Sequence, residues 1–388
     1  MADTAPLIPA YGGSSLADLP RALLAALGVG EAAGEPGSLR IEPARAVCVL
    51  LVDGLGAEAL RAHAGAAPFL TRGMRPPAGT APGASVLTAG FPATTVTSLC
   101  SLGTGLPPGE HGMMGLVLAV PGTGLLFNCL RWTLPDGLVM DPRRWQPAPT
   151  VFERARAAGV TAAYVAPGEH AGSGLSEAVY RGVRHLAAGT VDERVERARE
   201  ALREAPAYVT VYYGDLDAAG HDTGWGGEEW LRQLAIVDRL AERLAEALPD
   251  GCALYVTADH GMVNATGKLD VEAEPALRHG VALLGGEARA RHVYAEEGAV
   301  ADVLAAWRGT LAGRAWVVTR EEAVEAGWFG PAVRAEWLPR LGDVLAVPYD
   351  GLALVAPGAH PREAAFTGYH GSMTAAEQYV PLLEASTR

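Results

Sequence analysis

Apolar residues along the chain fall into short unbroken runs, which alternate with longer stretches of helical periodicity. Unbroken runs of apolar, β-branched and aromatic residues indicate strands that are covered on both faces. The runs of this kind are 46–52, 161–166, 207–213 and 252–257. The helices expected between them lie near 57–64, 95–102, 149–158, 190–203 and 227–247. This alternation predicts an α/β fold of three layers, in which a mainly parallel sheet carries helices on both faces.

A different pattern follows the last of these runs. Short strands and one helix are expected there at 289–294, 298–311, 315–319 and 344–347. Together these elements predict a compact unit of the βαβ kind. We therefore expect a core made of residues 1–263 and 349–388, with a small α+β cap inserted at 264–348.

Acidic and histidine side chains stand at the carboxyl ends of the predicted strands. Asp53 follows the first strand, and the adjacent pair Asp259 and His260 follows the last. In parallel α/β sheets, ligands gather outside the carboxyl ends of the strands. Carboxylates combined with imidazoles suit zinc or a similar cation, so these residues are candidate metal ligands. Asp53 could equally cap the helix that begins at Ala57.

The strand at 207–213 also ends in acids. Asp217 and His221 are four positions apart, so one helical turn would bring both side chains to the same face. Asp215 could be a ligand or a turn residue, and the spacing favours Asp217. Near the C-terminus, His370 lies in a glycine-flanked loop, where a histidine on its own would be a surface residue.

A threonine-rich segment begins a short helix of small residues. Pro92 precedes Thr94 and Thr95, and Gly103 and Gly105 mark the end of the helix. A threonine at a helix start lies among free backbone N–H groups at the positive end of the helix dipole, which suits a phosphoryl oxygen. The same residue could be an ordinary N-cap.

Taken in order, these segments resemble the alkaline phosphatase superfamily, and specifically its type I phosphodiesterase/nucleotide pyrophosphatase family, from about residue 46 to about residue 375. The resemblance implies an alkaline-phosphatase-like core, a hydrolase of phosphodiester or pyrophosphate bonds, and two zinc ions. The residues implied as ligands of one ion are Asp217, His221 and His370. Those implied for the other are Asp53, Asp259, His260 and the nucleophilic threonine.

The resemblance places this nucleophile nine residues before Thr104, at Thr95. In the family, the threonine commonly stands just before an aromatic-proline pair. Here Phe91-Pro92 comes before the two threonines, which leaves Thr94 as an alternative. A threonine hydroxyl is a poor nucleophile without activation, and a bound divalent metal can supply that activation. The expected reaction is two in-line displacements through a phosphothreonine.

The charge at this centre favours a diester as substrate. Two zinc ions and three aspartates leave a small positive charge, which an ionised threonine would cancel. A dianionic monoester would want a dedicated cation, and no arginine lies in the segments around Thr95 or Asp259. Asn128 and Arg131 are the candidate donors to the substrate, although Asn128 could simply end a strand.

Other functions on the same residues stay open. A phosphomonoesterase or a phosphonate hydrolase could use the same centre, and a non-catalytic metal-binding module belongs to a different class. Zinc is the ion that the resemblance implies, while manganese or iron would also accept these ligands. The expected partner is a small-molecule phosphate ester, and the oligomeric state has no signal in the sequence.

The composition argues against some classes of partner. The chain has 388 residues and a net charge of −13 at pH 7, which argues against a surface that coats nucleic acid or binds an anionic membrane. Its four cysteines lack Cys-x-x-Cys spacing and are expected to be reduced thiols of a cytoplasmic protein. We expect no membrane helix, and no signal peptide, because the N-terminus lacks a basic region followed by a long apolar stretch.

Overall fold

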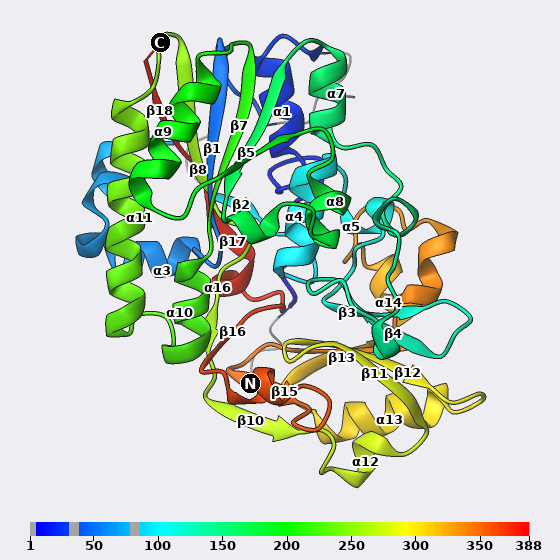
Figure 1. Cartoon of the computed structure of the whole chain (residues 1–388). Helices are drawn as coiled ribbons and strands as arrows, with labels where there is room; N and C mark the ends of the chain where they lie inside the picture. The colour runs from blue at the N-terminus through cyan, green and yellow to red at the C-terminus, as the bar shows by residue number, and fades with distance from the viewer. Residues whose placement is uncertain (1–4, 31–38, 78–85, 388) are drawn as a thin grey trace.

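A six-stranded sheet forms the centre of the structure (Figure 1). The computed structural model describes residues 5–30, 39–77 and 86–387, so residues 1–4, 31–38, 78–85 and 388 of the predicted core lie outside the described part. The sheet has the strand order β18-β8-β1-β7-β5-β6. Its strands are β1 (Ala46–Val52), β5 (Thr161–Ala166), β6 (Arg184–Ala187), β7 (Ala207–Tyr213), β8 (Cys252–Thr257) and β18 (Leu383–Ser386). All neighbours pair in parallel except β18, which is an antiparallel edge strand.

Helices cover both faces of this sheet, as the sequence predicts. On one side lie α9 (Val191–Leu202) and α11 (Glu228–Glu246), and on the other lie α1 (Leu19–Ala26) and α7 (Val151–Ala157) (Figure 1). The other helices of this part are α3 (Ala57–Ala62), α4 (Thr95–Thr104), α5 (Pro108–His111), α6 (Pro142–Trp145), α8 (Gly174–Val179) and α10 (Asp215–Thr223). Every residue of β1 is buried, because helices cover both of its faces. The central sheet and its two helical layers confirm the predicted α/β class.

A second sheet lies below the first in Figure 1. It has the order β11-β12-β14-β13 and is antiparallel throughout. Its strands are β11 (Val281–Glu287), β12 (Ala290–Ala295), β13 (Ala315–Thr319) and β14 (Val344–Pro348). The helices beside it are α12 (Pro275–Arg278), α13 (Val300–Thr310) and α14 (Arg320–Glu325). Since β12 and β13 both run antiparallel to β14, they are parallel to each other, and α13 connects them as in the expected βαβ unit.

Short strand pairs connect the two sheets. β9 (Val263–Asn264) pairs with β16 (Gly368–Tyr369), and β10 (Gly267–Asp270) pairs with β15 (Leu352–Val355). The remaining pairs are β2 (Val86–Thr88) with β17 (Tyr379–Pro381) and β3 (Val117–Val120) with β4 (Leu125–Asn128). The last helices are α15 (Pro361–Ala365) and α16 (Ala375–Gln378). Because β10 lies inside the expected cap and β15 outside it, the two parts are joined by backbone pairing as well as by the chain.

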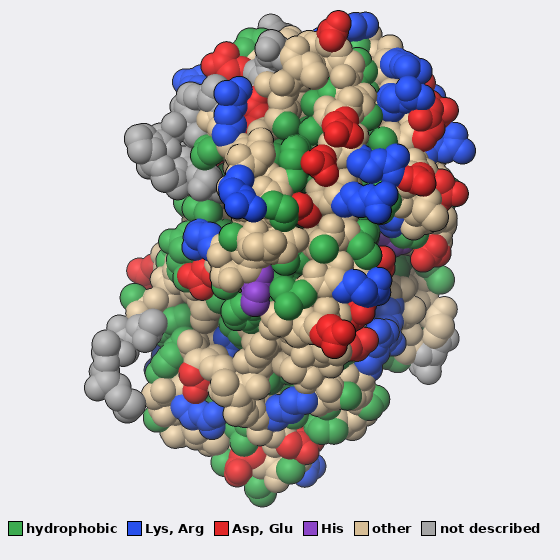
Figure 2. All heavy atoms as spheres, turned by 90° about the vertical axis from the view of Figure 1, so that its left-hand side faces the viewer, with side chains coloured by type: hydrophobic (Ala, Val, Ile, Leu, Met, Phe, Trp, Pro, Cys, Tyr) green, Lys and Arg blue, Asp and Glu red, His purple; other side chains and the backbone are tan. Residues whose placement is uncertain are grey.

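The cysteines and the surface bear on the expected environment. All four cysteines are buried and free. Within the described ranges, no helix combines the length and the apolar character that a bilayer crossing would need. On the face shown in Figure 2, basic and acidic side chains are interspersed and do not gather into one basic patch.

Candidate active site

The three central strands end at the same edge of the sheet. Val52 at the end of β1 lies beside Tyr213 of β7, and Leu51 lies beside Thr257 of β8. Residues that follow these strands are therefore neighbours in space, although the chain separates them widely. This edge collects the predicted acids and histidines.

Asp53, Asp259 and His260 form one buried group at this edge. Nε2 of His260 lies 3.4 Å from Oδ1 of Asp53 and 3.5 Å from Oδ2 of Asp259. The Tyr212 hydroxyl donates to Oδ2 of Asp53. The alternative role of Asp53 as a helix cap is wrong, because the N-cap of α3 is Gly56. Both Asp259 and His260 are fully buried, so any ligand of this group would be shielded from water.

Asp217, His221 and His370 lie beside the first group. Asp217 and His221 are on one face of α10, with Oδ2 and Nε2 3.3 Å apart. Nε2 of His370 lies 3.3 Å from Nε2 of His221, and its ring stacks on that of His260 with centroids 3.7 Å apart. The pairing of β9 with β16 explains this stacking, because β9 begins shortly after His260 and β16 ends just before His370.

The structure thus brings the six predicted acids and histidines into one cluster. Potential ligand atoms lie within 4.8 Å of one another in two sets, one of Asp53, Asp259 and His260, the other of Asp217, His260 and His370. His260 belongs to both sets, whereas the family resemblance implies His221 as a member of the second. His221 stands at the outer side of that set, in contact with Asp217 and His370.

The three histidines present the same nitrogen to the cluster. Their Nδ1 atoms face backbone carbonyl oxygens, at 2.9 Å for His221, 3.1 Å for His260 and 3.0 Å for His370. A carbonyl oxygen only accepts, so Nδ1 donates a proton there and a neutral ring directs the lone pair of Nε2 inward. Metal-binding histidines are held in this way by a backbone carbonyl or a carboxylate.

Several carboxylate oxygens of the cluster lack hydrogen bonds. Oδ1 of Asp53, Oδ1 of Asp217 and Oδ2 of Asp259 are buried without a hydrogen-bond partner among the described residues. Buried polar atoms are nearly always satisfied in folded proteins, and an unpaired buried charge is costly. Three such oxygens beside three inward-facing nitrogens fit the ligand set of a divalent cation.

The pKa values in the cluster report the same shortage of positive charge. Burial raises the pKa of Asp259 to about 7, and burial together with Asp259 and Asp217 raises the pKa of Asp53 well above its ordinary value. Burial lowers the pKa of His221, but Asp217 outweighs this effect and raises it to about 9. Burial and the neighbouring His260 hold the pKa of His370 well below its ordinary value. A bound cation would favour the ionised acids and the neutral histidines.

The two candidate nucleophiles stand at the start of α4. Thr94 is the N-cap residue, but its side chain makes no capping hydrogen bond, and Thr95 is the first helical residue. Oγ1 of Thr95 lies 3.2 Å from Nε2 of His260. The helix ends at Gly105 in the left-handed conformation, with φ of 69°, as its glycine signal predicts. Thr95 therefore touches the cluster of acids and histidines, and its ordinary role as an N-cap is wrong.

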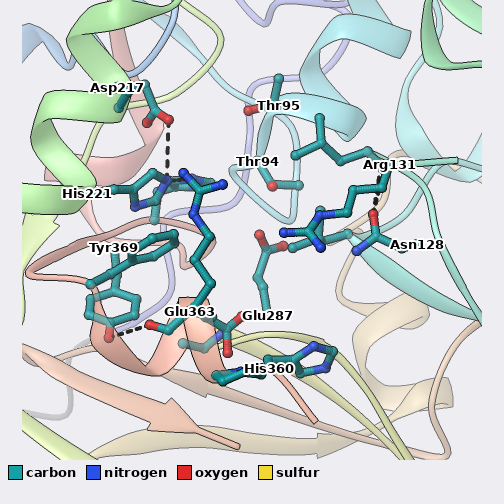
Figure 3. Close-up of a pocket in the computed structure, with 18 of the residues that line it drawn as sticks. Thr94, Thr95, Asn128, Arg131, Asp217, His221, Glu287, His360, Glu363 and Tyr369 are labelled. Atoms are coloured by element: carbon teal, nitrogen blue, oxygen red, sulfur yellow. Dashed lines mark hydrogen bonds and ion pairs between the residues drawn. The ribbon is translucent and has the colours of Figure 1, made fainter. Parts of the chain in front are cut away.

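A cavity of about 370 Å³ opens in front of this cluster. His370 lines it, and so do Thr94, Thr95 and the predicted donors Asn128 and Arg131, which are labelled in Figure 3. Oδ1 of Asn128 accepts hydrogen bonds from the backbone N–H groups of Leu130 and Arg131, at 3.1 and 2.8 Å. Its amide NH₂ group is thus the part available to donate to a ligand.

Two residues near the site escaped the sequence reasoning. Tyr212 lies within the aromatic end of β7, where the sequence shows only another apolar position. Glu287 also lines the cavity, and it follows Gly285 and Gly286 in a segment without strand alternation. In the sequence, Glu287 is marked only as a single acidic residue within an apolar stretch. Such residues are too common to identify a site residue.

Comparison with known proteins places these features in a family. The family described as type I phosphodiesterase/nucleotide pyrophosphatase matches residues 47–373, a range that includes every predicted site residue. No curated protein sequence matches the chain.

Solved structures share the fold. An inactive murine ectonucleotide pyrophosphatase/phosphodiesterase 5 in complex with AMP superposes with a TM-score of 0.68 and 18% identity, covering 88% of each chain. The human ectonucleotide pyrophosphatase/phosphodiesterase 5 gives 0.66 and 17%, again over 88% of each chain. Phosphonoacetate hydrolase from Sinorhizobium meliloti 1021 in complex with phosphonoformate gives 0.63 and 20%, covering 90% of this chain and 92% of the other. At these identities the likeness concerns the fold.

Proposed function

Because the chain belongs to the type I phosphodiesterase/nucleotide pyrophosphatase family, we propose that it cleaves its substrate through a covalent phosphothreonine formed on Thr95. Membership makes the protein a hydrolase of phosphodiester or pyrophosphate bonds. The observation that carries the proposed mechanism is the 3.2 Å approach of Oγ1 of Thr95 to Nε2 of His260, inside a cluster of acids and histidines with unpaired inward-facing atoms.

We propose two divalent cations at this cluster, with zinc as the expected ion. Asp217, His221 and His370 would hold one of them. Asp53, Asp259, His260 and Thr95 would hold the other. When bound, the ions would act as Lewis acids that lower the pKa of the Thr95 hydroxyl and neutralise charge on the leaving oxygen. The orphaned carboxylate oxygens of three aspartates support this assignment.

The protein residues have defined roles in the proposed reaction. Oγ1 of Thr95 loses its proton to solvent and attacks phosphorus, while the bond from phosphorus to the leaving oxygen breaks and that oxygen takes a proton from solvent. Water then attacks phosphorus, the bond to Oγ1 breaks, and Thr95 regains a proton. Asn128 and Arg131 would donate hydrogen bonds to the non-bridging oxygens, since both line the cavity. The N–H groups at the start of α4 are free of a side-chain cap and favour the same negative charge.

A small-molecule diester is the proposed substrate, and a phosphonate is the second candidate. Arg131 and Arg362 both line the cavity. A phosphonate that carries a second anionic group could use these cations. We propose that the protein is cytoplasmic. Its four cysteines are free and buried, which is typical of proteins in a reducing compartment.

A panel of esters tests the proposal. Purified protein loaded with zinc would be assayed on bis-p-nitrophenyl phosphate, a thymidine 5′-linked ester, p-nitrophenyl phosphate and phosphonoacetate, with and without a chelator. We expect hydrolysis of the diesters to exceed that of the monoester and to stop with the chelator. Preferential cleavage of phosphonoacetate would select the second candidate. Hydrolysis of none of the four would overturn both and favour a non-catalytic metal-binding module.

A further inference from the structure

Glu287 is a buried acid that faces the cavity from the second sheet. It is the last residue of β11, its exposed fraction is 3%, and it lines the cavity together with Thr94 and Thr95. Figure 3 shows its carboxyl group between Thr94 and Glu363. Its Oε1 atom is buried and has no hydrogen-bond partner among the described residues. The proposed mechanism does not use this residue.

The two arginines that follow Glu287 closely in the chain are engaged with other acids. Arg291 of β12 pairs with Glu363 of α15. Arg289 forms two hydrogen bonds with the carboxylate of Glu377 of α16, at 3.0 and 2.8 Å. These two arginines are thus paired with Glu377 and Glu363, and the other arginines that line the cavity with Glu287 are Arg131 and Arg362.

The protonation state of Glu287 follows from these neighbours. Burial, reinforced by the charges of Glu363 and Glu377, raises the pKa of Glu287 to about 8, against the opposing effects of the Thr94 hydrogen bond and Arg291. At neutral pH these neighbours favour the protonated carboxyl group. The Thr94 hydroxyl is hydrogen-bonded to this carboxyl group, and the unpartnered Oε1 atom can carry the proton.

We propose that Glu287 is a substrate-binding residue, whose neutral carboxyl group donates a hydrogen bond to an oxygen bonded to the reacting phosphorus. This role rests on the proposed function, and through it Glu287 would bring the second sheet into contact with the substrate. Because Glu287 and Thr95 line the same cavity, we expect the phosphoryl group bound at Thr95 to be the part of the substrate that reaches Glu287. A carboxylate at this position would repel that group, whereas a carboxylic acid binds it.

Two substitutions separate a donor from a merely structural side chain. Glu287→Gln keeps the shape and a hydrogen-bond donor but cannot ionise, and Glu287→Leu removes the donor. Glu296→Gln, at an exposed position beyond β12, is the matched control for an acid-to-amide change. Each variant would be assayed with zinc and bis-p-nitrophenyl phosphate at pH 7 and pH 9.5, with inorganic phosphate as the competitive inhibitor.

We expect Glu287→Leu to lower kcat/KM at least about tenfold, and to weaken inhibition by inorganic phosphate by a similar factor, as for the loss of one hydrogen bond to a charged group. At pH 7, Glu287→Gln should stay within about threefold of the wild type. Between pH 7 and pH 9.5 the wild type should lose activity relative to Glu287→Gln, because only the acid becomes charged. Glu296→Gln should match the wild type at both values.

The outcomes of these assays distinguish a wrong role for Glu287 from a wrong proposed function. If Glu287 only held Thr94 in place, Glu287→Leu would lower kcat and leave inhibition by inorganic phosphate unchanged, and the inference would be overturned. Equal losses in the Gln and Leu variants at pH 7 would also overturn it, because they would indicate an ionised acceptor. If the Leu variant does not fold, the wild type and the Gln variant still decide, since parallel pH profiles contradict the inference. Failure of the wild type on every ester would instead reject the proposed function.

Discussion

Oγ1 of Thr95 lies 3.2 Å from Nε2 of His260, although the two residues are 165 positions apart in the chain. The adjacent Thr94 hydroxyl instead donates to Glu287 of the second sheet. Figure 3 shows both threonines at the wall of the cavity. Two neighbouring hydroxyl groups therefore have different partners, and only that of Thr95 meets the proposed metal ligands.

Replacement of these threonines tests the assignment of the nucleophile. We expect Thr95→Ala to lower kcat at least about 10³-fold, because no other group of the chain would form the covalent intermediate. Thr94→Ala should cost about tenfold or less, since it removes only a hydrogen bond to Glu287. Steady-state kinetics on a diester measures both. Full activity of Thr95→Ala would move the nucleophile to Thr94.

Metal content tests the role of the histidines. His370→Ala removes a nitrogen that lies in one of the two ligand sets, so the purified variant should bind about one equivalent of zinc less than the wild type. Elemental analysis after dialysis gives the stoichiometry. His279→Ala is the control, because His279 is an exposed residue that directly follows α12 and belongs to neither ligand set. Equal zinc contents in all three proteins would contradict the proposed centre.

Tyr212 should tune metal affinity without being a ligand. Its hydroxyl donates to Oδ2 of Asp53, and loss of such a partner to a ligand typically costs 10- to 100-fold in metal affinity, so we expect about that loss in Tyr212→Phe. Competition with a chelator measures the affinity. Tyr213→Phe is a matched control, because the Tyr213 hydroxyl donates to Gln233, away from the cluster. Similar zinc affinities for the two variants would exclude this role for Tyr212.

Four of the six strands of the central sheet were predictable because they are buried on both faces, whereas β6 and the edge strand β18 are partly exposed and were not predicted. The bounds of β1, β5, β7 and β8 agree with the predicted runs, since helices cover both sides and only apolar residues are tolerated there. The strand β11 escaped prediction for the opposite reason: several of its residues are only partly buried, and Gly285 and Gly286 interrupt it. Such a strand has neither alternation nor an unbroken run.

The candidate ligands could be selected from the sequence, but their arrangement could not. Strand ends and the spacing of Asp217 and His221 selected candidate ligands that the fold brings together. The position of His260 between both ligand sets depends on the pairing of β9 with β16, two-residue strands that leave no pattern in the sequence. The partners of Thr94 likewise depend on how the second sheet packs on the first, which local sequence does not encode.

A buried ion pair between the two parts of the structure should contribute strongly to stability. Arg289 and Glu377 are 1% and 0% exposed and bond through both carboxylate oxygens. Arg289→Met would leave Glu377 charged and unpaired, which should cost about 3–5 kcal/mol in the free energy of unfolding. Urea unfolding measures it. The exposed pair of Arg232 and Glu229 has similar geometry, and Arg232→Met should change little; equal effects would contradict the importance of burial.

The stability of the protein should fall with rising pH through Glu287. The pKa of this carboxyl is raised by burial from 4.5 to about 8, so between these values the folded protein retains a proton that the unfolded chain has lost. The folded state then binds more protons than the unfolded state, and its stability decreases as pH rises. Glu287→Gln has no proton to lose. The free energy of unfolding of Glu287→Gln, relative to that of the wild type, should therefore increase by about 2 kcal/mol or more between pH 5 and pH 8. Urea unfolding measures this difference, and Glu296→Gln is the control. If the difference in unfolding free energy between the two proteins stayed constant across this range, Glu287 would ionise in the folded protein as it does in the unfolded chain. That result would also contradict its proposed role as a neutral hydrogen-bond donor.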